Sequence, residues 1–256
     1  MSRLNIIQSG RGSDLVMLHG LFGNLDNFRS IAQSLEKHFH VTRIDLPGHG
    51  KSPSLNQLSI DSMADAVLAE LDHLFIEQYH LLGHSLGGKV SMCMAGKPES
   101  LGLRRMCVVD IAPKFYPPHH VSILNALRGL ELSSLVDRKQ ADDQLTDAIP
   151  DASIRAFLLK SLYRQNSEFH WRFDLERLHR DYPLIQQAPV IAKKIEQPTL
   201  FIKGGESNYL QNEDENLIRQ LFTRPSLKVI EGAGHWPHAE KPAAFTHICK
   251  AFFIDI

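Results

Sequence analysis

Only three cysteines, Cys93, Cys107 and Cys249, occur in this sequence of 256 residues, and none of them forms a CxxC pair. An odd number of widely spaced cysteines does not predict a disulfide framework or a zinc site. We expect reduced, mostly buried thiols, which are typical of a cytoplasmic protein. The first residues carry one arginine, a short apolar run and no small-residue cleavage site, so we expect no secretory signal.

Long apolar runs are also missing: none approaches the ~18–20 residues of a membrane-spanning helix, so we expect no membrane span. The 28 basic and 29 acidic residues give a net charge of -1, without the basic excess of nucleic-acid binders. No histidine lies in an HExxH pattern, and we expect neither a metal nor a cofactor. A hydrophobic content of 43% is ordinary for a globular protein. We expect the protein to be a monomer or a small homo-oligomer.

Short apolar segments alternate with longer amphipathic segments along most of the chain. Apolar strands separated by helices predict the α/β class, with a parallel sheet covered by helices on both faces. We expect strands at 15–18, 41–46, 79–83, 106–111, 199–203 and 227–230, and helices at 27–37, 60–74, 86–95 and 242–253.

The middle of the chain breaks this alternation. Segment 112–194 contains helical patterns at 124–135, 138–148 and 153–162 and almost no strand signal. We therefore predict an all-helical insertion that forms a lid over the carboxyl ends of the strands, where open α/β sheets keep their sites. Residues 1–111 and 195–256 would then form the core, and the alternative is that the extra helices pack elsewhere.

The sequence GHSLG places Ser85 between Gly83 and Gly87, after a predicted strand and before a predicted helix. A G-x-S-x-G match indicates a catalytic serine only in this context, because the serine then lies on a sharp strand-to-helix turn. The turn would lift the Ser85 hydroxyl toward a helix N-terminus, where free N–H groups favour developing negative charge. We predict that Ser85 is a nucleophile.

A serine nucleophile needs a base, and the chain offers fourteen histidines. Only His235 and His238 lie between the last predicted strand and the last helix, where the order serine, acid, histidine places the base. His235 follows Gly-Ala-Gly, a loop able to turn its ring toward the serine. We assign the base to His235 and treat His238 as a supporting or surface residue.

Two backbone N–H groups should stabilise the oxyanion. One is the N–H of Leu86, directly after the nucleophile, and the other is that of Leu21, directly after the His-Gly pair that ends an early strand. Phe22 would line the acyl pocket beside them. Trp236 and Tyr209 lie on loops that we expect at the mouth of the site, as substrate-binding residues.

Six segments together resemble the α/β-hydrolase family: LHGLFGNLDNF, IDLPGHGKS, GHSLGGKV, VVDIAP, LFIKGG and GAGHWPHAEKP. The chain is most similar to the small bacterial YbfF-type acyl esterases. This resemblance covers nearly the whole chain. It implies a mostly parallel sheet of about eight strands with a helical lid before the last two, and activity on short-chain esters and acyl-CoA thioesters.

The triad acid departs from the common pattern of that family. The usual aspartate position after LFIKGG holds Ser207, and Glu206 precedes it. Asp110 is an alternative, because it ends an apolar strand where a charge is costly unless it is paired. An acid must hold the histidine tautomer and stabilise the imidazolium. We favour Asp110 over Glu206 and leave both open.

These parts predict a cytoplasmic serine esterase or thioesterase that hydrolyses short- to medium-chain carboxylic or acyl-CoA esters through an acyl-enzyme. Its partner would be a small-molecule substrate, and the basic residues Arg155, Lys160 and Arg164 are candidates for contacts to a phosphate-bearing leaving group. A C–C bond hydrolase or lyase of the same fold is the alternative, and a non-catalytic binding protein is a third hypothesis.

Overall fold

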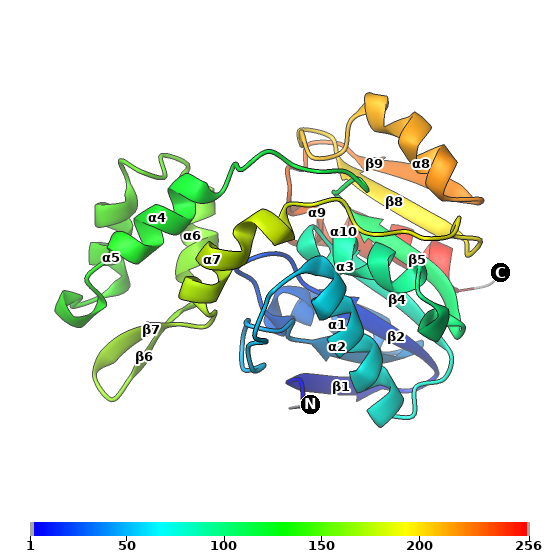
Figure 1. Ribbon diagram of the computed structural model, residues 1–256, viewed down its shortest axis with the longest axis horizontal. Helices are drawn as coiled ribbons and strands as arrows, with labels where there is room; N and C mark the ends of the chain where they lie inside the picture. The colour runs from blue at the N-terminus through cyan, green and yellow to red at the C-terminus, as the bar shows by residue number, and fades with distance from the viewer. Residues whose placement is uncertain (1–2, 255–256) are drawn as a thin grey trace.

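A seven-stranded sheet forms the centre of the computed structural model, which describes residues 3–254 (Figure 1). The strand order is β1-β3-β2-β4-β5-β8-β9, and only β1 runs antiparallel to its neighbour. The mostly parallel α/β sheet predicted from the alternation is confirmed. The strands are β1 (Ile6–Gly10), β2 (Ser13–Leu18), β3 (Phe39–Ile44), β4 (Tyr79–His84), β5 (Leu103–Val109), β8 (Thr199–Gly204) and β9 (Pro225–Ile230).

Helices cover both faces because successive side chains of a strand point to opposite faces. On β2, Leu15 and Met17 pack with α1 (Arg29–Leu35) and α10 (Pro242–Phe253). Val16 and Leu18 belong to the opposite core, with α2 (Ile60–His73), α3 (Leu86–Ala95) and α8 (Glu215–Leu221). Shorter elements of this part are α9 (Pro237–Glu240) and the 3-10 turns η1 (Leu25–Phe28), η2 (Pro98–Ser100) and η4 (Asn212–Asp214).

The resemblance implied about eight strands, and the central sheet of the described residues has seven. One of the seven, β1, was not expected at all. Its sequence IIQSG begins with two apolar residues and has a mostly exposed edge-strand pattern, so no hydrophobic alternation identifies it. Its pairing with β3 is set by tertiary contact rather than by a local signal.

The chain between β5 and β8 forms a separate group of elements to one side of the sheet (Figure 1). Its helices are α4 (Val121–Gly129), α5 (Arg138–Leu145), α6 (Ala152–Leu159) and α7 (Leu175–Ile185), with the 3-10 turn η3 (Leu132–Ser134). The expectation that this inserted segment contains only helices is wrong, because β6 (Leu162–Gln165) and β7 (Glu168–Trp171) form an antiparallel hairpin. Asn166 and Ser167 at its tip have φ angles of 47° and 72°, which a tight two-residue hairpin turn requires.

Lys89 of α3 anchors the inserted segment to the core. Its side chain is buried, and Nζ donates hydrogen bonds to the carbonyl oxygens of Gln186 (2.9 Å) and Gln187 (2.6 Å), just after α7. The ammonium also lies 4.9 Å from the ring centroid of Tyr116, near the start of the same segment. Burial lowers the pKa of Lys89 to about 7. Both connections of the inserted segment thus meet at one side chain of α3.

The three cysteines are free and buried. Over residues 3–254, no helix combines the length and the apolar character that crossing a membrane would take.

Candidate active site

Ser85 lies on a tight turn between β4 and α3. Its φ of 51° and ψ of -114° fall in a region that a non-glycine residue rarely adopts, and such strain is retained where surrounding contacts enforce it. The flanking glycines allow the turn to close. A Cβ atom at Gly83 would overlap the carbonyl oxygen of Gly87, and one at Gly87 would overlap the carbonyl oxygen of Leu18 at the end of β2.

A continuous chain of hydrogen bonds joins Ser85 to a buried carboxylate. His235 Nε2 lies 3.0 Å from Ser85 Oγ, and His235 Nδ1 lies 2.7 Å from Asp110 Oδ2. Asp110 directly follows β5, is fully buried and also has a positive φ of 52°. Its Oδ1 accepts the backbone N–H of Gly204 at 3.0 Å. With its proton on Nδ1, His235 donates to Asp110 and accepts from the serine.

The two candidate acids have different environments. Ser207, which occupies the position where an aspartate was expected, donates its hydroxyl to Asp110 Oδ2. Glu206 is exposed at the rim of the site, and among residues 3–254 its carboxylate makes no hydrogen bond to His235. The structure therefore brings Asp110, and not Glu206, to the histidine.

The expected oxyanion donors lie beside the nucleophile. The N–H of Gly87 donates to the carbonyl oxygen of His19 at 3.1 Å, which holds the start of α3 against the end of β2. Gly20 packs so closely that a Cβ atom there would lie 3.3 Å from the Cβ of Ser85. Within the described part of the chain, no backbone carbonyl accepts the N–H of Leu21 or Leu86. Leu86 is the first residue of α3, and free N–H groups in the first turn of a helix are typical binding groups for negative charge.

Several supporting side chains carry no recognisable sequence signal. His84 donates from Nε2 to the carbonyl oxygen of His235 at 2.7 Å, and its ring lies 4.8 Å from that of His235. Burial is the first cause that lowers the pKa of His84 well below its usual value, and it also lowers the pKa of His238 to about 3 and of His120 to about 4. These neighbouring histidines are therefore neutral at physiological pH.

A hollow of about 690 Å³ surrounds Ser85. The three residues expected to bind substrate, Phe22, Trp236 and Tyr209, all line it together with Leu21. Phe22 is almost fully buried, so it contributes a wall rather than a mobile contact. The hollow also takes apolar side chains from the inserted segment and carboxylates at its rim: Ile123, Ile154, Phe157, Leu158, Asp151, Glu206 and Glu240.

A neighbouring hollow of about 710 Å³ shares Phe157 and Trp236 with the first. The rings of these two residues pack 5.1 Å apart between the two hollows. Three cations line the second hollow: Lys51, Lys160 and Arg172. Asp26 and Glu240 line it as well, but Glu240 accepts the backbone N–H groups of Gly234 and Trp236, at 2.6 and 3.1 Å.

Of the three basic residues expected to contact a phosphate group, only Lys160 lies in either hollow. Arg155 is buried and pairs with Asp142 at 2.8 Å, so it has a structural role in the inserted segment. Arg164 lies on the exposed hairpin, where its guanidinium packs over the ring of Phe169.

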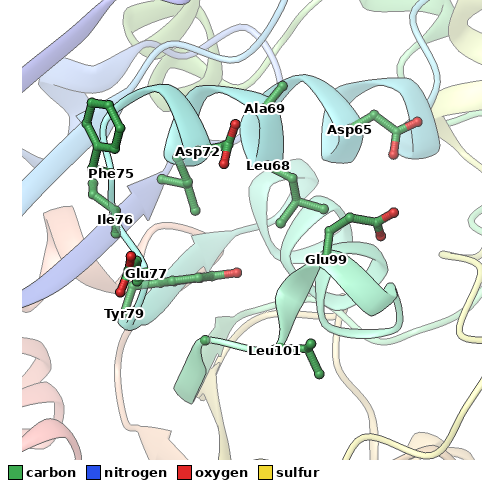
Figure 2. A pocket seen from close by; sticks show the side chains of 12 residues that line it. Asp65, Leu68, Ala69, Asp72, Phe75, Ile76, Glu77, Tyr79, Glu99 and Leu101 are labelled. Carbon is green, nitrogen blue, oxygen red and sulfur yellow. The ribbon is translucent and has the colours of Figure 1, made fainter.

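A third hollow, of about 680 Å³, is the one whose lining side chains Figure 2 shows. It is lined by α2 side chains such as Leu68 and Asp72, and by Phe75, Tyr79 and Leu101, which lie at or just before the amino ends of β4 and β5. Ser85 and Asp110 follow the carboxyl ends of the same strands. This hollow contains no nucleophile with a neighbouring base, so the candidate active site is the one around Ser85.

Nothing in the described residues resembles a metal centre, since no three His, Cys, Asp or Glu side chains cluster in a way that would hold an ion.

The family model for the alpha/beta hydrolase fold matches residues 15–167, and the chain belongs to this family. It is 37% identical over 244 residues to the sn-1-specific diacylglycerol lipase ABHD11 of Danio rerio, covering 92% of this chain and 77% of that protein. It is 32% identical over 247 residues to the esterase YbfF of Escherichia coli, covering 95% and 94%.

Among solved structures, a marine microorganism esterase superposes with a TM-score of 0.94 at 32% identity, covering 98% of this chain and 99% of that one. The resemblance to YbfF-type esterases predicted from the motifs is therefore confirmed. The protein is an enzyme, a carboxylic ester hydrolase of the alpha/beta hydrolase family.

Proposed function

We propose that this hydrolase is a serine esterase that acts on short- to medium-chain carboxylic esters through the triad Ser85, His235 and Asp110. The observation that carries the proposal is the unbroken hydrogen-bond chain from Ser85 Oγ through the imidazole to the buried Asp110. A nucleophile in contact with a base that a third group orients is the arrangement that activates a serine hydroxyl.

The proposed reaction has two halves. His235 Nε2 takes the proton of Ser85 Oγ as the oxygen attacks the ester carbonyl, and Asp110 stabilises the imidazolium that forms. The bond between the carbonyl carbon and the leaving oxygen then breaks, and His235 gives its proton to the departing alcohol. Water, deprotonated by the same imidazole, cleaves the acyl-enzyme, releasing the acid and restoring the serine.

The N–H groups of Leu21 and Leu86 are the proposed donors to the oxyanion in both halves. Each such donor is worth about 3–4 kcal/mol in enzymes of this type, because it is already oriented when the charge develops. The positive φ of Phe22, 63°, shows that the backbone next to Leu21 holds an unusual conformation. Strain of this kind is typical of loops that present backbone groups to a substrate.

A series of p-nitrophenyl esters from acetyl to palmitoyl tests the proposal. We expect the largest kcat/KM for short to medium acyl chains, because the hollow beside Ser85 is lined by apolar side chains but is limited to about 690 Å³. Initial rates of p-nitrophenol release give kcat/KM for each ester. Inert wild-type protein across the series, with turnover of a C–C substrate such as a vinylogous diketone, would contradict the esterase proposal.

The hollow lined by Lys51, Lys160 and Arg172 favours a second candidate substrate, an acyl-CoA thioester. Within residues 3–254 these cations have no carboxylate in ion-pair contact, and their hollow adjoins the one around Ser85 at Phe157 and Trp236. Phosphate groups are attracted by such clustered cations. Because Lys51 and Lys160 are exposed, each would contribute only a modest free energy to phosphate binding.

We expect the double variant Lys51→Met/Lys160→Met to lower kcat/KM for butyryl-CoA about tenfold, since each exposed contact is worth up to ~1 kcal/mol. The same variant should hydrolyse the butyryl thioester of N-acetylcysteamine, which has no phosphate, at the wild-type rate. Lys139→Met on α5, outside both hollows, is the matched control. Equal losses on both thioesters would rule out phosphate recognition at this hollow.

A further inference from the structure

We infer that Tyr209 is a positioning residue, which holds the imidazole of His235 in the orientation that contacts both Ser85 and Asp110. This inference rests on the proposed triad and deepens it. The two rings stack with their centroids 3.8 Å apart and their planes 20° from parallel. The sequence had assigned Tyr209 to substrate binding, and the stacking adds a contact with the base itself.

The His235 loop is held through its backbone, because Glu240 accepts the N–H groups of Gly234 and Trp236, but these bonds do not orient the imidazole. The loop follows Gly232, whose φ is 65°, and Gly234, and the short helix α9 begins only at Pro237. The imidazole is instead held from two sides: Tyr209 stacks on one face, and the ring of His84 lies 4.8 Å away at an angle of 47°. Removing the Tyr209 ring would therefore leave His235 free to rotate away from one or both partners.

Tyr209 is itself fixed at three points. Its N–H donates to Ser207 Oγ at 3.2 Å, and its carbonyl oxygen accepts the hydroxyl of Tyr116 at 2.5 Å. Its own hydroxyl lies 3.3 Å from Nε2 of His120, whose Nδ1 lies 2.9 Å from the hydroxyl of Tyr182. Burial raises the pKa of Tyr209 to about 12, so the hydroxyl stays protonated during turnover.

These contacts join the acid, the base and the inserted segment through one loop. Ser207 donates to the triad acid, and two residues later Tyr209 stacks on the triad base. Tyr116 and His120 belong to the inserted segment, so its position also sets that of Tyr209. The loop with Ser207 in place of the family's usual aspartate therefore supports both the acid Asp110 and the base His235.

The experiment compares Tyr209→Leu with Tyr209→Phe on p-nitrophenyl acetate, a substrate too small to need the rim of the hollow. We expect Tyr209→Leu to lower kcat about tenfold and to leave KM within about twofold, because a misplaced base slows chemistry without weakening binding. Tyr209→Phe keeps the stacked ring and should retain kcat within about threefold. Tyr163→Leu, on the hairpin away from the site, is the matched control.

Three outcomes would overturn the inference: a raised KM with unchanged kcat in Tyr209→Leu, equal loss in both Tyr209 variants, or no loss in either. If Tyr209→Leu does not fold, Tyr116→Phe replaces it, because it keeps the ring and removes the hydroxyl that donates to the Tyr209 carbonyl and accepts the N–H of Ala112. That variant should lower kcat about threefold with KM unchanged, and an unchanged kcat would also refute the inference. Wild-type protein without esterase activity would instead refute the proposed function.

Discussion

Replacing Ser85 with alanine should lower kcat for p-nitrophenyl butyrate by about 10⁴-fold or more, the largest effect expected from any single substitution in this chain. The reason is that, among the described residues, Ser85 Oγ is the only group hydrogen-bonded to His235 Nε2, so no neighbouring hydroxyl can replace it. The oxyanion N–H groups would remain in the variant and would leave a small residual rate. Steady-state rates measure the loss of kcat and the residual rate. The stoichiometry of labelling by a fluorophosphonate measures the loss of the serine nucleophile.

Alanine at Ser34, a half-buried serine of α1 whose hydroxyl bonds within its own helix, is the matched control and should keep the wild-type rate. Ser85→Ala should also keep the wild-type melting temperature within a few degrees, because alanine keeps the Cβ atom in the same turn and only the hydroxyl is lost. Near-normal turnover in folded Ser85→Ala would exclude the acyl-enzyme mechanism. Direct attack of a water molecule on the ester, without an acyl-enzyme, would then be the mechanism to test.

The fold was predictable where local signals agree with the final packing. The parallel strands β2, β4, β5 and β8 are short apolar runs between amphipathic helices, and that alternation alone specifies an α/β sheet with two covered faces. β1 could not be predicted, because an exposed edge strand has no buried face to pattern it.

The hairpin in the inserted segment was missed for a different reason. Four-residue strands are shorter than one clear hydrophobic period, and LYRQ and EFHW fit a helix as well as a strand. The turn between the two strands is formed by Asn166 and Ser167, both at positive φ. A hairpin is predicted from sequence mainly by Asn-Gly at these two positions, and this turn lacks that dipeptide. Whether these two short segments form strands is decided by their pairing with each other in the folded protein.

For the candidate site, motifs with backbone requirements were the informative ones. Gly83 and Gly87 mark the turn at Ser85 because side chains there would collide with backbone atoms. By contrast, the contacts of Tyr209, Ser207 and His84 with the acid and the base join segments far apart in the chain. Nothing in the sequence next to these residues reports such contacts, since each depends on how two distant loops meet at one edge of the sheet.

The second large effect is expected at the acid. Asp110→Asn should lower kcat by about 10³- to 10⁴-fold at pH 7, because an amide at this position no longer stabilises the imidazolium and favours the wrong tautomer of His235. The carboxylate is fully buried and accepts from Gly204 N–H, Ser207 Oγ and His235 Nδ1, so the asparagine side chain fits the same space. Its NH₂ group would face one of these donors and break the network.

Glu206→Gln is the decisive companion variant, because Glu206 is the rival acid and lies three residues before Tyr209. Its exposed carboxylate makes no contact with His235 within residues 3–254, so the change should alter kcat no more than about twofold. The opposite ranking, with Asp110→Asn near normal and Glu206→Gln reduced by orders of magnitude, would transfer the acid to Glu206. Such a transfer would require the loop that begins at Gly205 to turn inward during catalysis, because Ser207 and not Glu206 faces Asp110 in this conformation.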